Sequence, residues 1–111
     1  MKILKNESNI FIIQVQGNMD LFSSNLLKEQ VMKMIEQKIE RFIIDLKETV
    51  TINSAGIGAL INISSTAQKL NFHFILVNVN DEIREALEIN KLSAYIPIAA
   101  TLKEAVKLVE S

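Results

Sequence analysis

The stretch from Arg41 to Ile61 reads RFIIDLKETVTINSAGIGALI and contains the pattern that decides the fold. Its opening segment, RFIIDL, is short, apolar and β-branched, which is typical of a central strand buried on both faces. Residues 47–52 are expected to form a loop, and from about Ser54 to Leu70 apolar residues recur at helical spacing. A buried strand followed by a helix is the repeating unit of an α/β sheet.

The sequence before this stretch predicts a hairpin and a helix. Residues 1–5 and 9–16 have the composition of strands, and the turn-like residues 6–9 separate them. Gly17 and Asn18 are expected to end the second strand. A long amphipathic helix follows, because apolar residues then recur at helical spacing. The apolar face of that helix comprises Phe22, Leu26, Leu27, Val31, Met34, Ile35 and Ile39.

The sequence after the stretch continues the alternation of strands and helices. HFILVNV (73–79) and YIPI (95–98) predict strands, and NDEIREALEINKL predicts a helix capped by Asn80 or Asp81. Thr101 and Glu104 have the spacing of a capping box, which predicts a last helix over residues 101–110. The predicted order is ββαβαβαβα. We therefore expect an α/β fold in one domain, residues 1–111, with a mixed, mostly parallel sheet covered by about four helices.

Composition excludes several classes of function. The chain has 111 residues, of which 49% are hydrophobic and 23% charged, so it is expected to fold around a core of its own. Its net charge is −1, with 12 basic and 13 acidic residues, which argues against nucleic acid as a partner. Cysteine is absent, which excludes disulfides and sulfur-ligated metals. No signal peptide or membrane-inserting segment is apparent, and a cytoplasmic location is expected.

The residues for enzymatic chemistry are few. The single histidine, His73, has no second histidine to form a metal pair, and an exposed position on a strand is its expected role. Ser54 lacks the G-x-S-x-G context of a hydrolase nucleophile, and no lysine follows the glycines to make a phosphate-binding loop. Asp45 ends a central strand, but the acidic pair and lysine of a receiver domain are missing; Asp20 and Asp45 are interpreted as solvated caps. We expect no catalytic residue, metal or cofactor.

Two glycines near the start of the second helix suggest a contact surface. Asn53 or Ser54 is expected to cap this helix. Gly56 and Gly58 follow, and each glycine in a helix costs up to about 1 kcal/mol relative to alanine. Our interpretation is that small side chains leave the serine hydroxyl open to the surface of another protein.

These segments together resemble the STAS domain, specifically the single-domain bacterial anti-sigma-factor antagonists. The resemblance covers nearly the whole chain, and its specificity comes from the order and spacing of the segments. The matching segments are VQGNMD (15–20), RFIIDL (41–46), INSAGIGALI (52–61), FHFILVNVNDEIREALEINKL (72–92) and YIPIAATLKEAV (95–106).

The resemblance implies a binding protein that regulates sigma-factor-dependent transcription and is not an enzyme. In the family, a GHKL-type anti-sigma factor is also a serine kinase, which supplies ATP and Mg²⁺ and phosphorylates the signature serine. Ser54 matches that serine, and a separate serine phosphatase resets the switch. Asp20 matches an aspartate that contacts the kinase. The implied partner-binding residues are Asp20, Asn53, Ser54, Ala55, Gly56 and Gly58.

The start of a helix is a suitable place for a phosphoserine, because the helix dipole and free N–H groups tolerate its negative charge. The sequence departs from the family at Asn53, where aspartate is usual. This change favours an alternative function, a STAS subunit of a membrane lipid transporter bound to an ABC ATPase. The intact S-A-G-I-G core (54–58) favours the regulatory switch. A third alternative is a small metabolic enzyme of flavodoxin-like layout that uses His73, Asp20 and Asp45.

Overall fold

A five-stranded sheet forms the centre of the computed structural model, which describes residues 1–6 and 8–110. The strand order is β1-β2-β4-β6-β7; β1 is antiparallel to β2, and the other neighbouring pairs are parallel. The predicted mixed, mostly parallel sheet is thus confirmed. Its strands are β1 (Lys2–Lys5), β2 (Phe11–Gln14), β4 (Arg41–Asp45), β6 (His73–Val77) and β7 (Ile98–Ala99).

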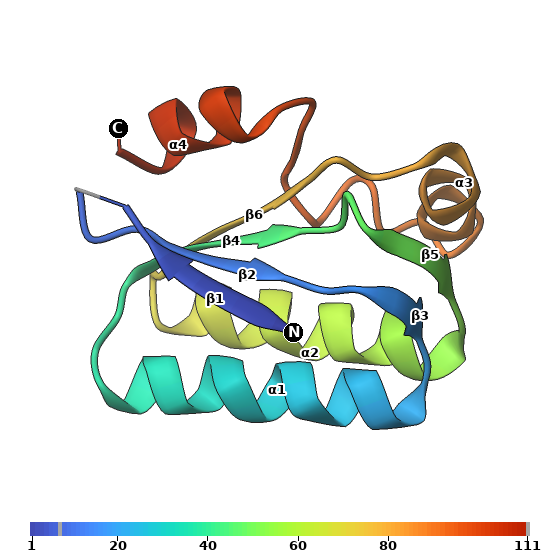
Figure 1. Ribbon diagram of the computed structural model, residues 1–111, viewed down its shortest axis with the longest axis horizontal. Helices are drawn as coiled ribbons and strands as arrows, with labels where there is room; N and C mark the ends of the chain where they lie inside the picture. Colours follow the sequence, from blue (N-terminus) through green and yellow to red (C-terminus); the bar gives the residue numbers. More distant parts are fainter. Residues whose placement is uncertain (7, 111) are drawn as a thin grey trace.

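Four helices surround the sheet, as predicted (Figure 1). Helices α1 (Leu21–Glu36) and α2 (Ser54–Lys69) lie side by side on one face, and α4 (Leu102–Glu110) lies on the other. Helix α3 (Asp81–Ile89) lies at one end of the sheet. In the described part of the chain, no helix has both the length and the apolar character needed to span a membrane.

The alternation of side chains along the strands divides the core into two layers. On β4, Phe42 and Ile44 belong to the layer under α1 and α2, whereas Ile43 points into the layer under α4. Phe42 stacks on Phe74 of the next strand, with ring centroids 5.4 Å apart. The central strands are therefore buried on both faces, as the apolar run RFIIDL predicts.

A second, two-stranded sheet was not predicted. It pairs β3 (Gly17–Met19) with β5 (Thr49–Ile52) in parallel, so the prediction of a loop at 47–52 is wrong for residues 49–52. The second strand ends before Gly17, as expected, but Gly17 then begins a further strand. The hydroxyl of Thr51 donates to Asn18 Oδ1 across the pair at 2.8 Å. β3 has no apolar alternation of its own and forms only because β5 lies beside it.

The last strand begins three residues later than predicted. Pairing with β6 starts at Ile98, opposite Leu76, and residues 95–97 lie outside β7. Pro97 accepts a hydrogen bond from Leu76 N at 2.9 Å, but its own nitrogen carries no hydrogen to continue the ladder. The proline therefore precedes the strand instead of lying within it.

The packing of α1 leaves one polar atom without a partner. Ser24 is 1% exposed, and its hydroxyl forms no hydrogen bond with the described residues. We expect Ser24→Ala to raise the free energy of unfolding by about 1 kcal/mol, because burying an unpaired hydroxyl is unfavourable. Urea denaturation measures this change. A Ser24→Ala protein that is less stable than the parent would show that the hydroxyl is bonded after all.

Candidate functional site

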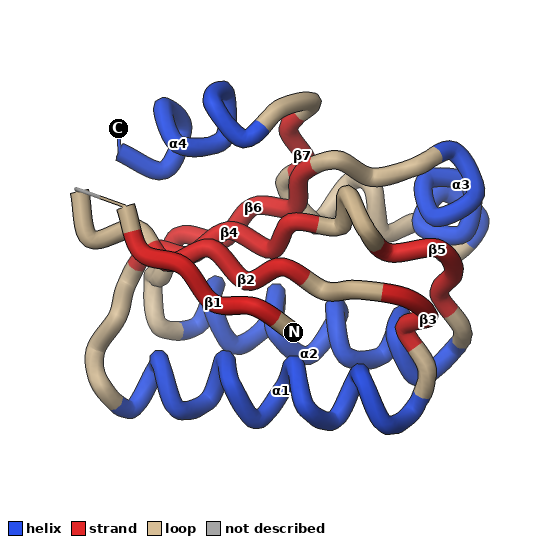
Figure 2. The backbone as a smooth tube through the Cα atoms, in the orientation of Figure 1, coloured by secondary structure: helices blue, strands red, loops and turns tan. Residues whose placement is uncertain are grey.

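The β3–β5 pair brings the starts of two long helices together. Met19 lies opposite Ile52, and the residues that follow them, Asp20 and Asn53, are the N-caps of α1 and α2. Asn53 N donates to Met19 O at 3.3 Å, which ties the cap of α2 to the residue before the cap of α1. Figure 2 shows β3 and β5 side by side, with α1 and α2 beginning directly after them. Parallel pairing of the strands thus makes one site of two segments that are far apart in the sequence.

Asn53 accepts hydrogen bonds from most of the N–H groups at the start of α2. Its side-chain oxygen accepts from Ala55 N at 3.0 Å and Gly56 N at 3.2 Å, and its carbonyl oxygen accepts from Ile57 N at 3.0 Å. The expectation of several free N–H groups is therefore wrong. In the described structure only Ser54 N, of the first four amides of the helix, has no acceptor. A phosphoryl group on Ser54 would therefore find few backbone N–H groups of α2 free to donate to it.

Ser54 itself is exposed, and its hydroxyl forms no hydrogen bond with any described residue. It is the first residue of α2, as predicted. Asn53 beside it is also exposed, and Ala55 is half-buried. The hydroxyl is accordingly accessible to a second protein.

Gly56 and Gly58 differ in their surroundings. A Cβ on Gly56 would lie 2.6 Å from Ile52 Cγ1 and 2.9 Å from the carbonyl oxygen of Met19, whereas one on Gly58 would meet nothing within 4 Å. Gly56 is buried and Gly58 is exposed. The cost of glycine relative to alanine, expected at both positions, does not apply to Gly56, where only glycine lets α2 approach β3. Gly58 has no such packing reason.

A comparison with known families identifies the chain. The sequence profile of the STAS domain matches residues 2–105. The chain belongs to the STAS-domain family. The segments that carry the resemblance in the sequence are the strands, caps and helix starts described above, so the family assignment and the geometry concern the same residues.

Three known proteins illustrate the similarity of this STAS domain. A TM1081 homologue from Thermotoga neapolitana, described as a candidate anti-sigma factor antagonist, is 21% identical over 103 residues, covering 92% of this chain and 91% of its own. The crystal structure of TM1081 from Thermotoga maritima superposes with a TM-score of 0.91 at 19% identity, covering 99% of this chain and 94% of that one. Phosphorylated SpoIIAA from Bacillus superposes with a TM-score of 0.76 at 17% identity, covering 97% of each chain.

Asp20 contributes the negative charge of the site. It is exposed, and its side chain accepts from Ser23 N at 2.9 Å. This hydrogen bond is the main reason why the pKa of Asp20 is lowered from 3.8, so the carboxylate is ionised at neutral pH. The first turns of α1 and α2 contain no acidic residue, which leaves Asp20 as the single carboxylate among the two caps and first turns.

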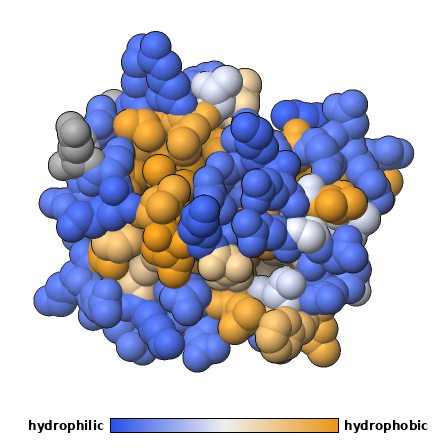
Figure 3. All heavy atoms as spheres, in the orientation of Figure 1, coloured by the Kyte–Doolittle hydropathy of each residue, from blue (hydrophilic) through white to orange (hydrophobic). Residues whose placement is uncertain are grey.

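Exposed hydrophobic side chains adjoin the caps. Leu21 and Phe22, in the first turn of α1, are 64% and 73% exposed, and Val50 on β5 is 58% exposed. Figure 3 shows hydrophobic surface at the lower right, where α1 begins. The prediction that Phe22 belongs to the buried face of the helix is wrong, because the hydrophobic core contacts of that face begin at Leu27. Hydrophobic residues exposed together near a polar site are typical of a protein contact.

The surroundings of Asp45 and His73, the other residues considered for enzymatic chemistry, do not form a metal-binding site in the described part of the chain. The interpretation of Asp45 as a solvated cap is wrong: it is 4% exposed, and its Oδ1 accepts from Lys47 N at 2.9 Å and Asn78 Nδ2 at 3.0 Å. His73 is exposed on β6, as expected. Among the described residues, no group of three or more histidine, cysteine, aspartate or glutamate side chains could hold a metal ion.

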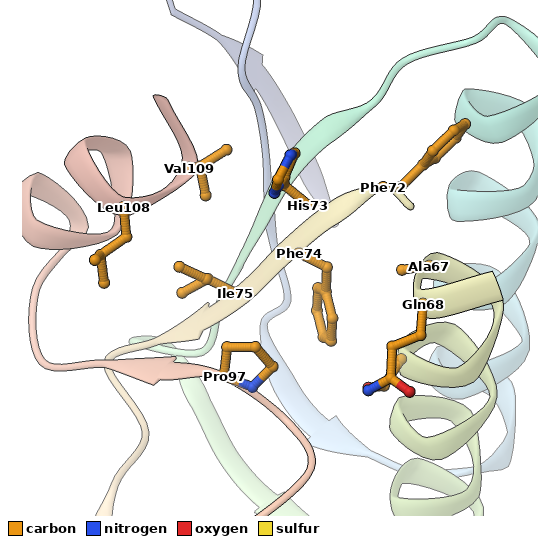
Figure 4. Close-up of a pocket in the computed structure, with 10 residues that line it drawn as sticks. Ala67, Gln68, Phe72, His73, Phe74, Ile75, Pro97, Leu108 and Val109 are labelled. Carbon is orange, nitrogen blue, oxygen red and sulfur yellow. The ribbon is translucent and has the colours of Figure 1, made fainter. Parts of the chain in front are cut away.

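A cavity of about 200 Å³ lies away from the two caps. It is bordered by the second half of α2, by β6 and by α4, and Figure 4 shows Phe74, Pro97 and Leu108 pointing toward it from different elements. His73 also borders it. Its lining contains none of the residues expected to bind a partner, so the candidate functional site of the STAS domain is the exposed surface around Ser54.

Proposed function

We propose that this STAS domain is an anti-sigma-factor antagonist that binds an anti-sigma factor and releases it when Ser54 is phosphorylated. The observation that carries the proposal is the exposed, unbonded hydroxyl of Ser54 at the start of α2. Around it lie the ionised Asp20 and the exposed side chains of Leu21 and Phe22, which together offer a partner both charge and hydrophobic area. The domain acts as substrate and binder, without catalysis of its own.

Local repulsion is sufficient for the switch. A phosphoserine carries about −1.5 to −2 charges at pH 7. Because Asn53 occupies the amides of Ala55 and Gly56, the phosphoryl oxygens would project toward the partner instead of folding back onto α2. A carboxylate of the partner about 5 Å from the phosphoryl group would raise the energy of the complex by roughly 3 kcal/mol for each unit of like charge, at an effective dielectric constant near 20. The partner is then released while the fold is retained.

The proposed partners follow from this chemistry. The kinase is the anti-sigma factor itself, of GHKL type, and brings ATP and Mg²⁺; a serine phosphatase restores the hydroxyl. The existence of solved structures of SpoIIAA in unphosphorylated and phosphorylated forms supports the proposal, because both have the fold of this chain, with TM-scores of 0.78 and 0.76. We place the domain in the bacterial cytoplasm, where such regulators would meet.

Phosphorylation of Ser54 is directly testable. We expect incubation with the cognate kinase, ATP and Mg²⁺ to add one phosphoryl group, which fragmentation mass spectrometry localises to Ser54. Ser54→Ala is the control and should remain unmodified. The half-buried hydroxyls of Ser23 and Thr51 are internal comparisons, since both lie near the same caps. A phosphate on either of them, or none at all, would contradict the assignment.

Affinity capture distinguishes the proposed function from the alternative. Recovery of a GHKL-type kinase whose binding is lost on phosphorylation supports the regulatory role. Recovery of an ABC ATPase that binds regardless of Ser54 would instead favour a subunit of a membrane lipid transporter. Asn53, in place of the usual aspartate, makes this comparison informative, because it removes one negative charge beside the acceptor hydroxyl.

A further inference from the structure

We propose that Asn80 is a positioning residue that holds β5, and through β5 the acceptor Ser54, in place. Asn80 caps α3, as the sequence predicts: its Oδ1 accepts from Ile83 N at 2.8 Å. Its Nδ2 makes further hydrogen bonds that capping α3 does not require. It donates to Thr49 O at 3.1 Å and to Val50 O at 3.2 Å, so one side chain joins α3 to β5.

The bond from Asn80 matters because β5 has few neighbours. It belongs to the two-stranded sheet, where β3 is its partner on one side, and the five-stranded sheet does not include it. Its other contacts are with helices α3 and α2, and a helix cannot continue a strand ladder. Asn80 Nδ2 supplies donors to two consecutive carbonyl groups of β5, those of Thr49 and Val50.

The position of β5 determines where α2 begins. The strand ends at Ile52, whose side chain packs against Gly56, and Asn53 follows as the cap that precedes Ser54. A movement of β5 therefore carries the acceptor hydroxyl with it. The role of Asn80 in phosphorylation rests on the function proposed above, whereas its role in holding β5 does not.

Two substitutions separate the bridge from the cap. Asn80→Asp and Asn80→Ser both keep an oxygen that can accept from Ile83 N, but neither retains the amide group that donates to Thr49 and Val50. Because Asn80→Asp adds a negative charge and Asn80→Ser does not, a comparison of the two variants shows any effect of the charge itself. Asn90→Asp is the matched control, because Asn90 Nδ2 donates to Ala86 O within α3, at the opposite end of the helix.

Hydrogen exchange of the intact protein tests the bridge. We expect the amides of β5 to exchange about tenfold faster in Asn80→Asp and Asn80→Ser than in the parent, with a smaller change in α3, since the loss of two hydrogen bonds falls on β5. Asn90→Asp should accelerate exchange in α3 and leave β5 unchanged. If the Asn80 variants accelerated exchange equally in α3 and β5, or left exchange in β5 unchanged, Asn80 would act only as a helix cap. Either result would overturn the proposal.

Phosphorylation kinetics test the consequence for Ser54. With the kinase recovered by affinity capture, we expect both Asn80 variants to raise KM about tenfold with kcat within about twofold of the parent, because only a fraction of molecules presents the serine correctly. Asn90→Asp should match the parent. Parent-like KM in the Asn80 variants would overturn the positioning role; a parent that is not phosphorylated would instead refute the proposed function, and exchange alone would then decide whether Asn80 holds β5.

Discussion

Replacing Ser54 with aspartate is expected to weaken binding of the anti-sigma partner about a hundredfold and to leave the far-UV circular dichroism spectrum unchanged. The physical reason is the added charge at an exposed position: repulsion of about 3 kcal/mol from a facing carboxylate corresponds to a loss of about two orders of magnitude in affinity. The fold should survive because the serine side chain makes no bond in the described structure. Titration calorimetry with the partner measures the effect.

The matched control for this variant is Ser54→Asn, which has nearly the same shape as Ser54→Asp but no charge. We expect Ser54→Asn to lose much less affinity, since bulk alone remains. Equal losses in the two variants would attribute the switch to steric exclusion and not to electrostatic repulsion. A Ser54→Asp protein that unfolds would contradict the local mechanism altogether.

The second large effect concerns stability. Gly56→Ala should lower the free energy of unfolding by about 2 to 3 kcal/mol, because its new methyl group would lie 2.9 Å from the carbonyl oxygen of Met19 and 2.6 Å from Ile52 Cγ1. The side chain of Ile52 can shift, but the backbone of β3 can move away only by weakening its pairing with β5. Thermal and urea denaturation both report the change.

Gly58→Ala is the matched control for Gly56→Ala, in the same helix and two residues further along the chain. Its methyl group meets no atom within 4 Å, so we expect a gain of up to about 1 kcal/mol from helix propensity. Partner affinity is the second measurement, since Gly58 is exposed on the proposed contact surface. If Gly56→Ala proved as stable as Gly58→Ala, the close approach of α2 to β3 would be wrong.

The sequence was informative wherever local pattern and tertiary structure agree. The strand RFIIDL is buried on both faces because every one of its positions is apolar or at the strand end. The start of α2 at Ser54 and the caps of α2 and α3 follow from side chains that bond to amides two or three residues away. The acceptor serine could be selected for the same reason, as the first residue after a cap.

The parts of the site that arise from contacts between distant segments could not be predicted. Nothing in Gly17–Met19 indicates a strand until β5 is placed beside it, although the four residues Thr49–Ile52 are all β-branched and signal a strand on their own. Phe22 fits the helical period of α1 but lies in its first turn, where it is exposed and outside the core. The close contact of Gly56 with Met19 likewise exists only after α2 lies against β3.

The neutral cap of α2 has a consequence for the behaviour of this surface in acid. Asp20 caps α1 as a carboxylate, and since its pKa lies below 3.8, that cap persists above this lowered value and weakens only as the pH falls through it. Asn53 has no proton to gain, so the bonds that it accepts from Ala55 and Gly56 do not titrate. Acidification would therefore loosen the first turn of α1 while the backbone around the acceptor hydroxyl keeps its shape.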